Sequence, residues 1–186
     1  MTITEQFKAK RCVFSIECFP PRQTTQMDKL KATLQQMQTL NPGFISVTFG
    51  AGGSAGGVST AEVADYIQNE LQIPTLAHLI CMGNDQLRAA EILDQLEAVG
   101  VRDVLALRGD LPYGWTGTGG DLHYATELVS FVRKNFGDKF TIAVAGSPEG
   151  HIACRSLDAD ISFLKQKQDE GADYIMTQLC WDMDQF

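Results

Sequence analysis

The sequence predicts an α/β protein in which parallel strands alternate with helices, as in a (β/α)8 TIM barrel. Short apolar runs rich in β-branched residues alternate with longer stretches of helical period, and turn residues separate the two kinds. The connections are short, so the strands are expected to be parallel and covered by helices. With 186 residues, of which 44% are hydrophobic, the chain can bury a core, and we expect one barrel domain over residues 1–186.

Each expected element follows from its own local pattern. Strands are expected at 13–19, 44–49, 75–80, 103–107, 140–145 and 173–177, where the apolar runs lie. Helices are expected at 25–40, 59–70, 85–98, 121–135 and 157–170. The sequences "NPG", "AVG" and "DEGAD" end the first, third and fifth helices, since each offers a glycine for a left-handed cap.

Polar residues at the ends of the expected strands favour a barrel over an open, doubly wound sheet. These residues are Glu17, Thr48, His78, Arg108 with Asp110, and Gln178. A barrel brings the carboxyl ends of its strands together on one face, whereas an open sheet spreads them along an edge. A closed barrel takes about 250 residues. We therefore expect an incomplete barrel of about six βα units, part of a longer protein or a truncated gene product, whose open edges could pair with another copy.

Composition narrows the classes of partner. The formal net charge of −8 disfavours binding to nucleic acid or to anionic membranes. There is no apolar run of about 20 residues and no signal-peptide core, which predicts a cytoplasmic protein. The five cysteines are scattered without metal-ligand spacing, so we expect reduced thiols and no metal site. A small molecule is the expected partner.

The glycine-rich stretch "GAGGSAGG" at 50–57 raises the question of a phosphate site. Gly50, Gly52 and Ala55 match a dinucleotide-binding spacing, but the next strand ends at His78 without the required carboxylate. A phosphate loop would need a lysine where Val58 stands. The stretch is therefore interpreted as a βα loop whose small residues let the backbone approach a ligand or a neighbouring loop.

Two strand ends carry candidate chemistry. In "FSIECFPPR" the apolar neighbours of Glu17 disfavour its ionised form, which suits a general acid; a solvated or ion-paired glutamate is the alternative. In "LALRGDLP" Arg108 and Asp110 flank Gly109, either as a structural salt bridge or as a turn that sets a carboxylate beside an electron-accepting ring. The hypothesis that the chain is an enzyme depends on these residues.

The remaining polar candidates have plainer interpretations. His78 and His151 could act as general bases, or they could be histidines satisfied by structural hydrogen bonds. Asp160 and Lys167 are seven residues apart on one face of an expected helix and, taken alone, are solvated charges.

Six motifs together resemble the methylenetetrahydrofolate reductase family. They occur in order from about Cys12 to the C-terminus as "FSIECFPPR", "FISVTFGAGGS", "PTLAHLIC", "VLALRGDLP", "VAGSPEGH" and "LKQKQDEGADYIMTQL". The resemblance implies a flavin-containing barrel in which FAD takes hydride from NADH or NADPH and reduces 5,10-methylenetetrahydrofolate to 5-methyltetrahydrofolate. It also implies a place in one-carbon metabolism and methionine synthesis.

The resemblance further implies roles for particular residues. Glu17 resembles the general acid that opens the folate imidazolidine ring, Asp110 the carboxylate near flavin and pterin, and Gln178 the amide that binds folate and nicotinamide. The implied FAD contacts are Thr48, His78, Leu107, Arg108, Gly109, Asp110, Tyr124, Ala125, Ala145, His151, Asp160 and Lys167. Ser147 and Cys18 depart from the family, which usually has aromatic residues there. A non-catalytic module that binds FAD or folate, or an inactive truncated chain, is the alternative.

Overall fold

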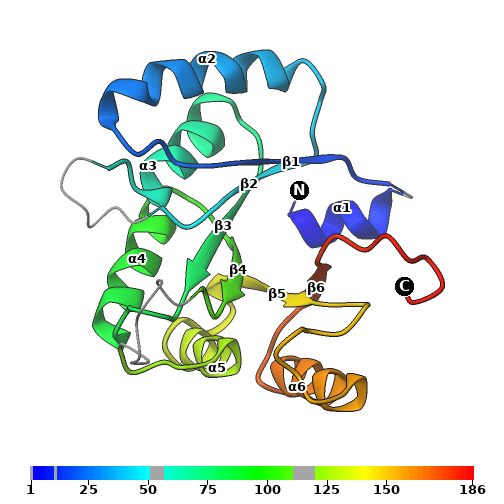
Figure 1. Cartoon of the computed structure of the whole chain (residues 1–186). Coiled ribbons are helices and arrows are strands. Elements are labelled where there is room, and N and C mark those ends of the chain that lie inside the picture. Colours follow the sequence, from blue (N-terminus) through cyan, green and yellow to red (C-terminus); the bar gives the residue numbers. More distant parts are fainter. Residues whose placement is uncertain (1, 11, 51–56, 111–119) are drawn as a thin grey trace. The chain divides into compact units, whose positions relative to one another are not determined.

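The computed structural model describes residues 2–10, 12–50, 57–110 and 120–186, in which strands and helices alternate (Figure 1). The strands are β1 (Ser15–Cys18), β2 (Phe44–Val47), β3 (Thr75–Ile80), β4 (Asp103–Leu107), β5 (Thr141–Gly146) and β6 (Tyr174–Thr177). They follow one another in the sheet in chain order, and the pairs β1–β2, β2–β3 and β5–β6 are parallel. A doubly wound sheet would reverse its strand order at a switch point. The predicted α/β class with parallel strands is confirmed.

Residue contacts divide the chain into two compact units. Unit 1 comprises Met1–Leu79 and Leu87–Val104, and unit 2 comprises Ile80–Gln86 and Leu105–Phe186. The helices of unit 1 are α1 (Ile3–Ala9), η1 (Thr24–Gln26), α2 (Met27–Gln38), α3 (Thr60–Asp65), η2 (Tyr66–Glu70) and nearly all of α4 (Gln86–Ala98). Those of unit 2 are α5 (Ala125–Phe136), η3 (Gly137–Lys139) and α6 (Leu157–Asp169). The expectation of a single domain stays a prediction.

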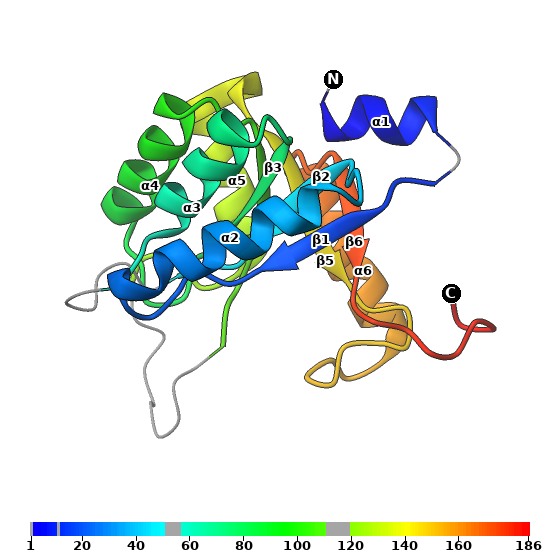
Figure 2. The ribbon, with the colours of Figure 1, turned by 90° about the horizontal axis from the view of Figure 1, so that it is seen from above.

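In unit 1, α2 and α3 lie side by side in both views (Figures 1 and 2). Their inner faces pack with β1 and β2 around a core of Cys18, Leu34, Ile45, Val47, Val58, Val63, Tyr66, Ile67, Leu71 and Ile73.

A reciprocal cap fixes the start of α3, because Ser59 Oγ accepts from the Glu62 amide at 3.1 Å and Glu62 Oε2 accepts from the Ser59 amide at 2.7 Å. The helix therefore begins at a defined residue soon after the glycine-rich stretch.

The helix α1 was not among the expected elements. It has only seven residues, too few to show a helical period, but Thr2 and Glu5 form the same kind of reciprocal cap as in α3. Ile3 is fully buried, and Gln6 Nε2 donates to the Gly43 carbonyl at 2.7 Å. Tertiary contacts therefore hold a segment whose own helical tendency is small.

In unit 2, β5 and β6 run side by side, with Ala145 opposite Met176 and Gly146 opposite Thr177. The core of this unit includes Leu128, Val129, Val132, Phe140, Ile142 and Val144. The expected helix at 121–135 begins later, at Ala125, with Tyr124 as its N-cap residue. The residues of that stretch before Ala125 form an irregular segment with bends instead, in which Leu122 is buried.

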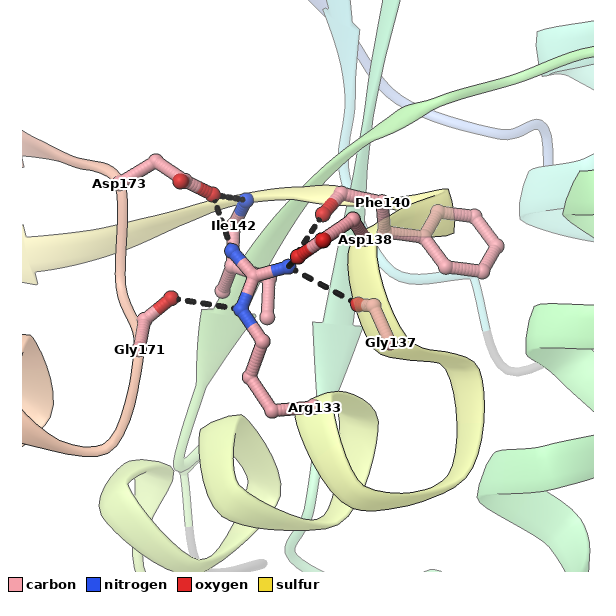
Figure 3. A network of polar contacts seen from close by, with 7 residues as sticks. All are labelled: Arg133, Gly137, Asp138, Phe140, Ile142, Gly171 and Asp173. Atoms are coloured by element: carbon pink, nitrogen blue, oxygen red, sulfur yellow. Dashed lines mark hydrogen bonds and ion pairs between the residues drawn. The ribbon is translucent and has the colours of Figure 1, made fainter.

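Arg133, near the end of α5, joins three segments of unit 2 (Figure 3). Its Nε donates to the Gly171 carbonyl at 2.8 Å, and its Nη1 donates to the carbonyls of Gly137 and Phe140 at 3.0 and 2.8 Å. Its Nη2 pairs with Asp173, whose Oδ2 also accepts from the Ile142 amide at 2.7 Å. One guanidinium thus ties α5 to the beginnings of β5 and β6.

Candidate functional site

Three polar side chains form a row across β1, β2 and β3 of unit 1. Glu17 lies directly opposite Ser46 in the parallel register, and Ser46 lies opposite Leu76, two residues before His78. Since side chains alternate between the two faces of a sheet, all three are on one face. Ser46 Oγ donates to Glu17 Oε2 at 3.4 Å, and His78 Nε2 lies 3.5 Å from the same oxygen. The structure therefore brings Glu17 and His78 together, as the sequence predicted for strand-end residues.

Burial affects the protonation of His78 in this row. The side chain of His78 is only 9% exposed, and burial lowers the pKa of its imidazole, while the neighbouring Glu17 carboxylate acts in the opposite direction. The 3.5 Å approach to Glu17 is not a hydrogen bond, and Nε2 has no other hydrogen-bond partner among the described residues. Cys18 points into the core instead, where burial and the adjacent Glu17 raise the pKa of its thiol to about 12. It is not a nucleophile at neutral pH.

Thr48 is held at the entrance of the glycine-rich stretch. Its amide donates to the Cys18 carbonyl at 3.0 Å, and its own carbonyl accepts from Thr60 Oγ1 at 3.1 Å. The same hydroxyl oxygen accepts from the Gly50 amide at 2.8 Å. A Cβ on Gly50 would come within 2.8 Å of Pro20, so here the glycine permits close packing of two loops. Gly52 and Ala55, two of the predicted fingerprint positions, lie outside the described residues.

The end of β4 is paired with the loop after β3 in unit 2. The carbonyl of Leu107 accepts from the Cys81 amide at 3.1 Å, and that of Arg108 accepts from the Met82 amide at 2.8 Å. Gly109 follows with φ +85° and a space limited by Ile80, so only glycine fits without strain. Asp110 is exposed, and within the described part of the chain no ion pair joins it to Arg108. The salt-bridge alternative is thus not seen.

The carbonyl end of β5 and the helix α6 bring four predicted residues together. Lys167 Nζ donates to the Ala145 carbonyl at 2.8 Å, and Asp160 Oδ2 accepts from the His151 amide at 2.9 Å. Burial lowers the pKa of Lys167, and Asp160 and Cys154 act against this shift. Cys154 Sγ approaches Asp160 Oδ1 at 3.4 Å. The two charges that the sequence left as solvated therefore belong to one half-buried network.

Three further predicted residues lie around unit 2 in separate positions. Gln178 follows β6, where its amide donates to the Gly146 carbonyl at 2.8 Å and its side chain is exposed. Tyr124 is exposed at the start of α5, and Ala125 beside it is buried. Ser147, one of the departures, is half-buried after β5 and accepts from the Gly150 amide. No described hydrogen bond or ion pair links these side chains to the network around Lys167.

Sequence reasoning missed Ser46 and Cys154. Ser46 is the one polar residue of the buried strand β2, and a hydroxyl in such a run is a signal that a partner is present. Cys154 gave no signal, because its contact with Asp160 depends on how the loop after β5 folds back on α6.

Few observations bear on the remaining predictions, which concern metal binding, membrane spans, location and partners. Among the described residues, no three His, Cys, Asp or Glu side chains gather as metal ligands would. None of the helices in the described ranges is long and apolar enough to cross a membrane. Cytoplasmic location, the absence of nucleic-acid binding and a possible homo-oligomer stay predictions.

Comparison with known proteins matches this chain to one family and one fold. A family model described as methylenetetrahydrofolate reductase matches residues 2–186. A protein of Oryza sativa subsp. japonica named "Probable methylenetetrahydrofolate reductase (NADH)" is 38% identical over 95% of this chain and 32% of its own length. A 5,10-methylenetetrahydrofolate reductase of Pectobacterium carotovorum subsp. carotovorum is 36% identical over 92% of this chain and 56% of its own length.

A solved structure shows the same fold without close sequence similarity. The crystal structure of 2,3-dimethylmalate lyase superposes with a TM-score of 0.59 at 11% identity, over 98% of this chain and 63% of that one. Lyases of this kind are TIM barrels, so the prediction of a partial (β/α) barrel is confirmed. The chain spans about a third of the rice protein and just over half of the bacterial one.

Proposed function

The chain belongs to the methylenetetrahydrofolate reductase family, and from this premise we propose that it takes part in reducing 5,10-methylenetetrahydrofolate to 5-methyltetrahydrofolate. NADH or NADPH is the proposed reductant and FAD the proposed carrier, in the one-carbon metabolism that supplies methionine synthesis in the cytoplasm. The observation that best supports this proposal is Glu17, a half-exposed carboxyl group set beside a buried serine and histidine.

The first proposed step is a proton transfer. The imidazolidine ring of the folate opens when a ring nitrogen accepts a proton and its bond to the methylene carbon breaks, which leaves an iminium on the other nitrogen. Glu17 in its protonated form supplies that proton. A hydride added to the iminium carbon then gives the methyl group. Asp110 and Gln178, which follow β4 and β6, are proposed to bind the pterin, and Gln178 also the nicotinamide.

The residues of unit 2 fit the FAD that the family implies. Lys167 is a half-buried ammonium whose pKa is lowered by burial, and a phosphate bound beside it would stabilise its charged form. Asp160 offers a carboxylate suited to ribose hydroxyls, and Gly109 presents backbone without a side chain. When bound, FAD would accept a hydride from NAD(P)H and pass it on to the folate. His78 and Thr48 in unit 1 stay proposed contacts.

The proposal can be tested on the purified protein with its flavin. A yellow protein that NADH or NADPH bleaches under anaerobic conditions, and that methylenetetrahydrofolate recolours, would support the reductase. If NAD(P)H cannot bleach a yellow protein, a non-catalytic module that binds flavin or folate becomes the better interpretation. If no flavin can be reconstituted, the cofactor assignment fails for this chain.

Replacing Lys167 with glutamine is expected to weaken FAD binding. Hydrogen bonds to charged groups contribute about 1.5–3 kcal/mol, so the Kd for FAD should rise at least about tenfold. Quenching of flavin fluorescence on titration measures that Kd directly. Lys165→Gln is the matched control, because Lys165 is an exposed residue of the same helix that pairs with Asp169. Equal Kd values for the two variants would remove Lys167 from the proposed site.

A further inference from the structure

The hydroxyl of Ser46 is placed unusually for a strand of this kind. Every residue of β2 is buried, and Ser46 is only 3% exposed among Phe44, Ile45 and Val47. A buried hydroxyl is costly unless it forms a hydrogen bond. Ser46 Oγ donates to Glu17 Oε2 at 3.4 Å from the opposite register position. The fold therefore directs this hydroxyl to the carboxyl group that we propose as the acid.

Both neighbours of Glu17 in the row approach the same carboxyl oxygen. Ser46 Oγ and His78 Nε2 lie 3.4 and 3.5 Å from Oε2. No described residue forms a hydrogen bond with Oε1. The Glu17 side chain is 48% exposed, whereas Ser46 and His78 are buried. The two oxygens of the Glu17 carboxyl group thus have different surroundings. Oε2 lies against Ser46 and His78, whereas Oε1 has no hydrogen bond from a described residue.

The charge state of His78 determines which oxygen of the Glu17 carboxyl group carries the proton. Because burial lowers the pKa of His78, the neutral ring is favoured at neutral pH. A neutral ring with its proton on Nε2 is attracted to Oε2, whereas an Nε2 lone pair would be repelled. A charged ring would instead favour the ionised carboxylate and remove the acid. In the protonated carboxyl group, the oxygen that accepts from Ser46 and lies nearest to the Nε2 proton is the carbonyl oxygen, and the other oxygen carries the proton.

We propose that Ser46 is a positioning residue that, together with His78, holds Oε2 of Glu17 as an acceptor and so leaves the acidic proton on the free oxygen, Oε1. This inference rests on the proposed reductase function, since it says which oxygen of Glu17 delivers the proton to the folate. Ser46 itself does not touch the substrate. Its removal lets the carboxyl group rotate and the proton occupy either oxygen.

The kinetic test compares the two half-reactions of the FAD-containing protein. Ser46→Ala is expected to slow reoxidation of the reduced flavin by methylenetetrahydrofolate about tenfold, less than complete loss of a general acid would. Reduction of the flavin by NAD(P)H and the Kd for folate should change less than about twofold, because a loss in the chemical step alone leaves binding intact. Equal slowing of both half-reactions would assign Ser46 a merely structural role and overturn the proposal.

Two further variants separate the hydrogen bond from packing. Ser46→Cys keeps the shape of the side chain with a slightly larger volume but supplies only a weak donor, so it should resemble Ser46→Ala; full activity in Ser46→Cys would overturn the proposal. Thr75→Val is the matched control, because it removes another buried hydroxyl of unit 1, that of the first residue of β3, which donates to the Ile73 carbonyl. Its folate half-reaction should stay within about twofold of the unmodified protein.

A spectroscopic test does not depend on turnover. With ¹⁵N-labelled histidine, the ring of His78 is expected to be neutral with its proton on Nε2 at pH 7; a lone pair on Nε2 or a charged ring would contradict the proposal. With ¹³C-labelled glutamate, the carboxyl signal that Glu17→Gln removes should move in Ser46→Ala and stay unchanged in Thr75→Val. If the unmodified protein reduces no folate, the proposed function fails, while these spectra still decide whether Ser46 holds Oε2.

Discussion

Replacing Glu17 with glutamine is expected to lower the rate of methylenetetrahydrofolate reduction by about 100-fold or more, while NAD(P)H still reduces the bound flavin at close to the normal rate. A general acid contributes about 10²–10⁴ in rate, and glutamine has no proton to transfer. The amide keeps an oxygen that can accept from Ser46, so the row across β1, β2 and β3 should persist. The change therefore isolates proton transfer from folding.

Stopped-flow absorbance of the flavin measures the two half-reactions separately. Glu91→Gln is a matched control, since its carboxylate belongs to the same unit, is 50% exposed against 48% for Glu17, and pairs with the nearby Arg88. This control should leave both half-reactions unchanged. Equal losses in the two half-reactions of Glu17→Gln would exclude the acid role, and so would a normal rate of folate reduction.

The sequence predicted the strands well because each is a short apolar run between turn residues. The predicted strand at 75–80 agrees with β3, and that at 103–107 agrees with β4. Predicted helix boundaries were less accurate where polar residues begin the segment, as at Asp121, four residues before α5. Periodicity reports burial, and it is weak at helix ends, where the backbone is held by caps and turns.

The site could be predicted only in part, for a physical reason that differs between the two units. Glu17 lies on β1 and His78 on β3, on either side of β2 in one parallel sheet, so their proximity follows from the strand order and register. Asp160 and Lys167 lie on α6, and nothing in the helical pattern shows that a loop amide and the carbonyl of Ala145 bind them. Resemblance to the family supplied those two residues, while the partner of Ser46 became known only through the register of β1 and β2.

The largest expected effect on stability comes from Arg133→Ala. The guanidinium donates to three carbonyls and pairs with Asp173, and truncation removes this donor from those carbonyls and leaves the carboxylate with only the Ile142 amide among its described donors. Breaking a buried ion pair costs about 3–5 kcal/mol. Because the Asp173 side chain is 40% exposed and water can replace part of the interaction, we expect a loss of about 2–3 kcal/mol in the free energy of unfolding.

Urea denaturation followed by circular dichroism measures this loss as a change in midpoint at constant slope. Lys134→Ala is the matched control on the same helix, and this exposed residue should change stability by less than about 0.5 kcal/mol. Arg133→Lys keeps the charge but cannot present the planar fork that reaches several carbonyls, so it should lose about half as much as the alanine variant. An Arg133→Ala protein as stable as the Lys134→Ala control would contradict the assigned role.

The Arg133 network also supports two strands that lead to residues proposed as ligand contacts. β5 begins directly after Phe140 and β6 directly after Asp173, both of which contact Arg133. At their other ends these strands carry Ala145 and lead to Gln178. Loss of the guanidinium should therefore loosen the start of both strands without touching a ligand. Hydrogen exchange in Arg133→Ala should increase first at the amide of Ile142, which donates to Asp173 in the native structure. If protection is lost equally throughout unit 2, Arg133 contributes to global stability and not to the anchoring of these strands.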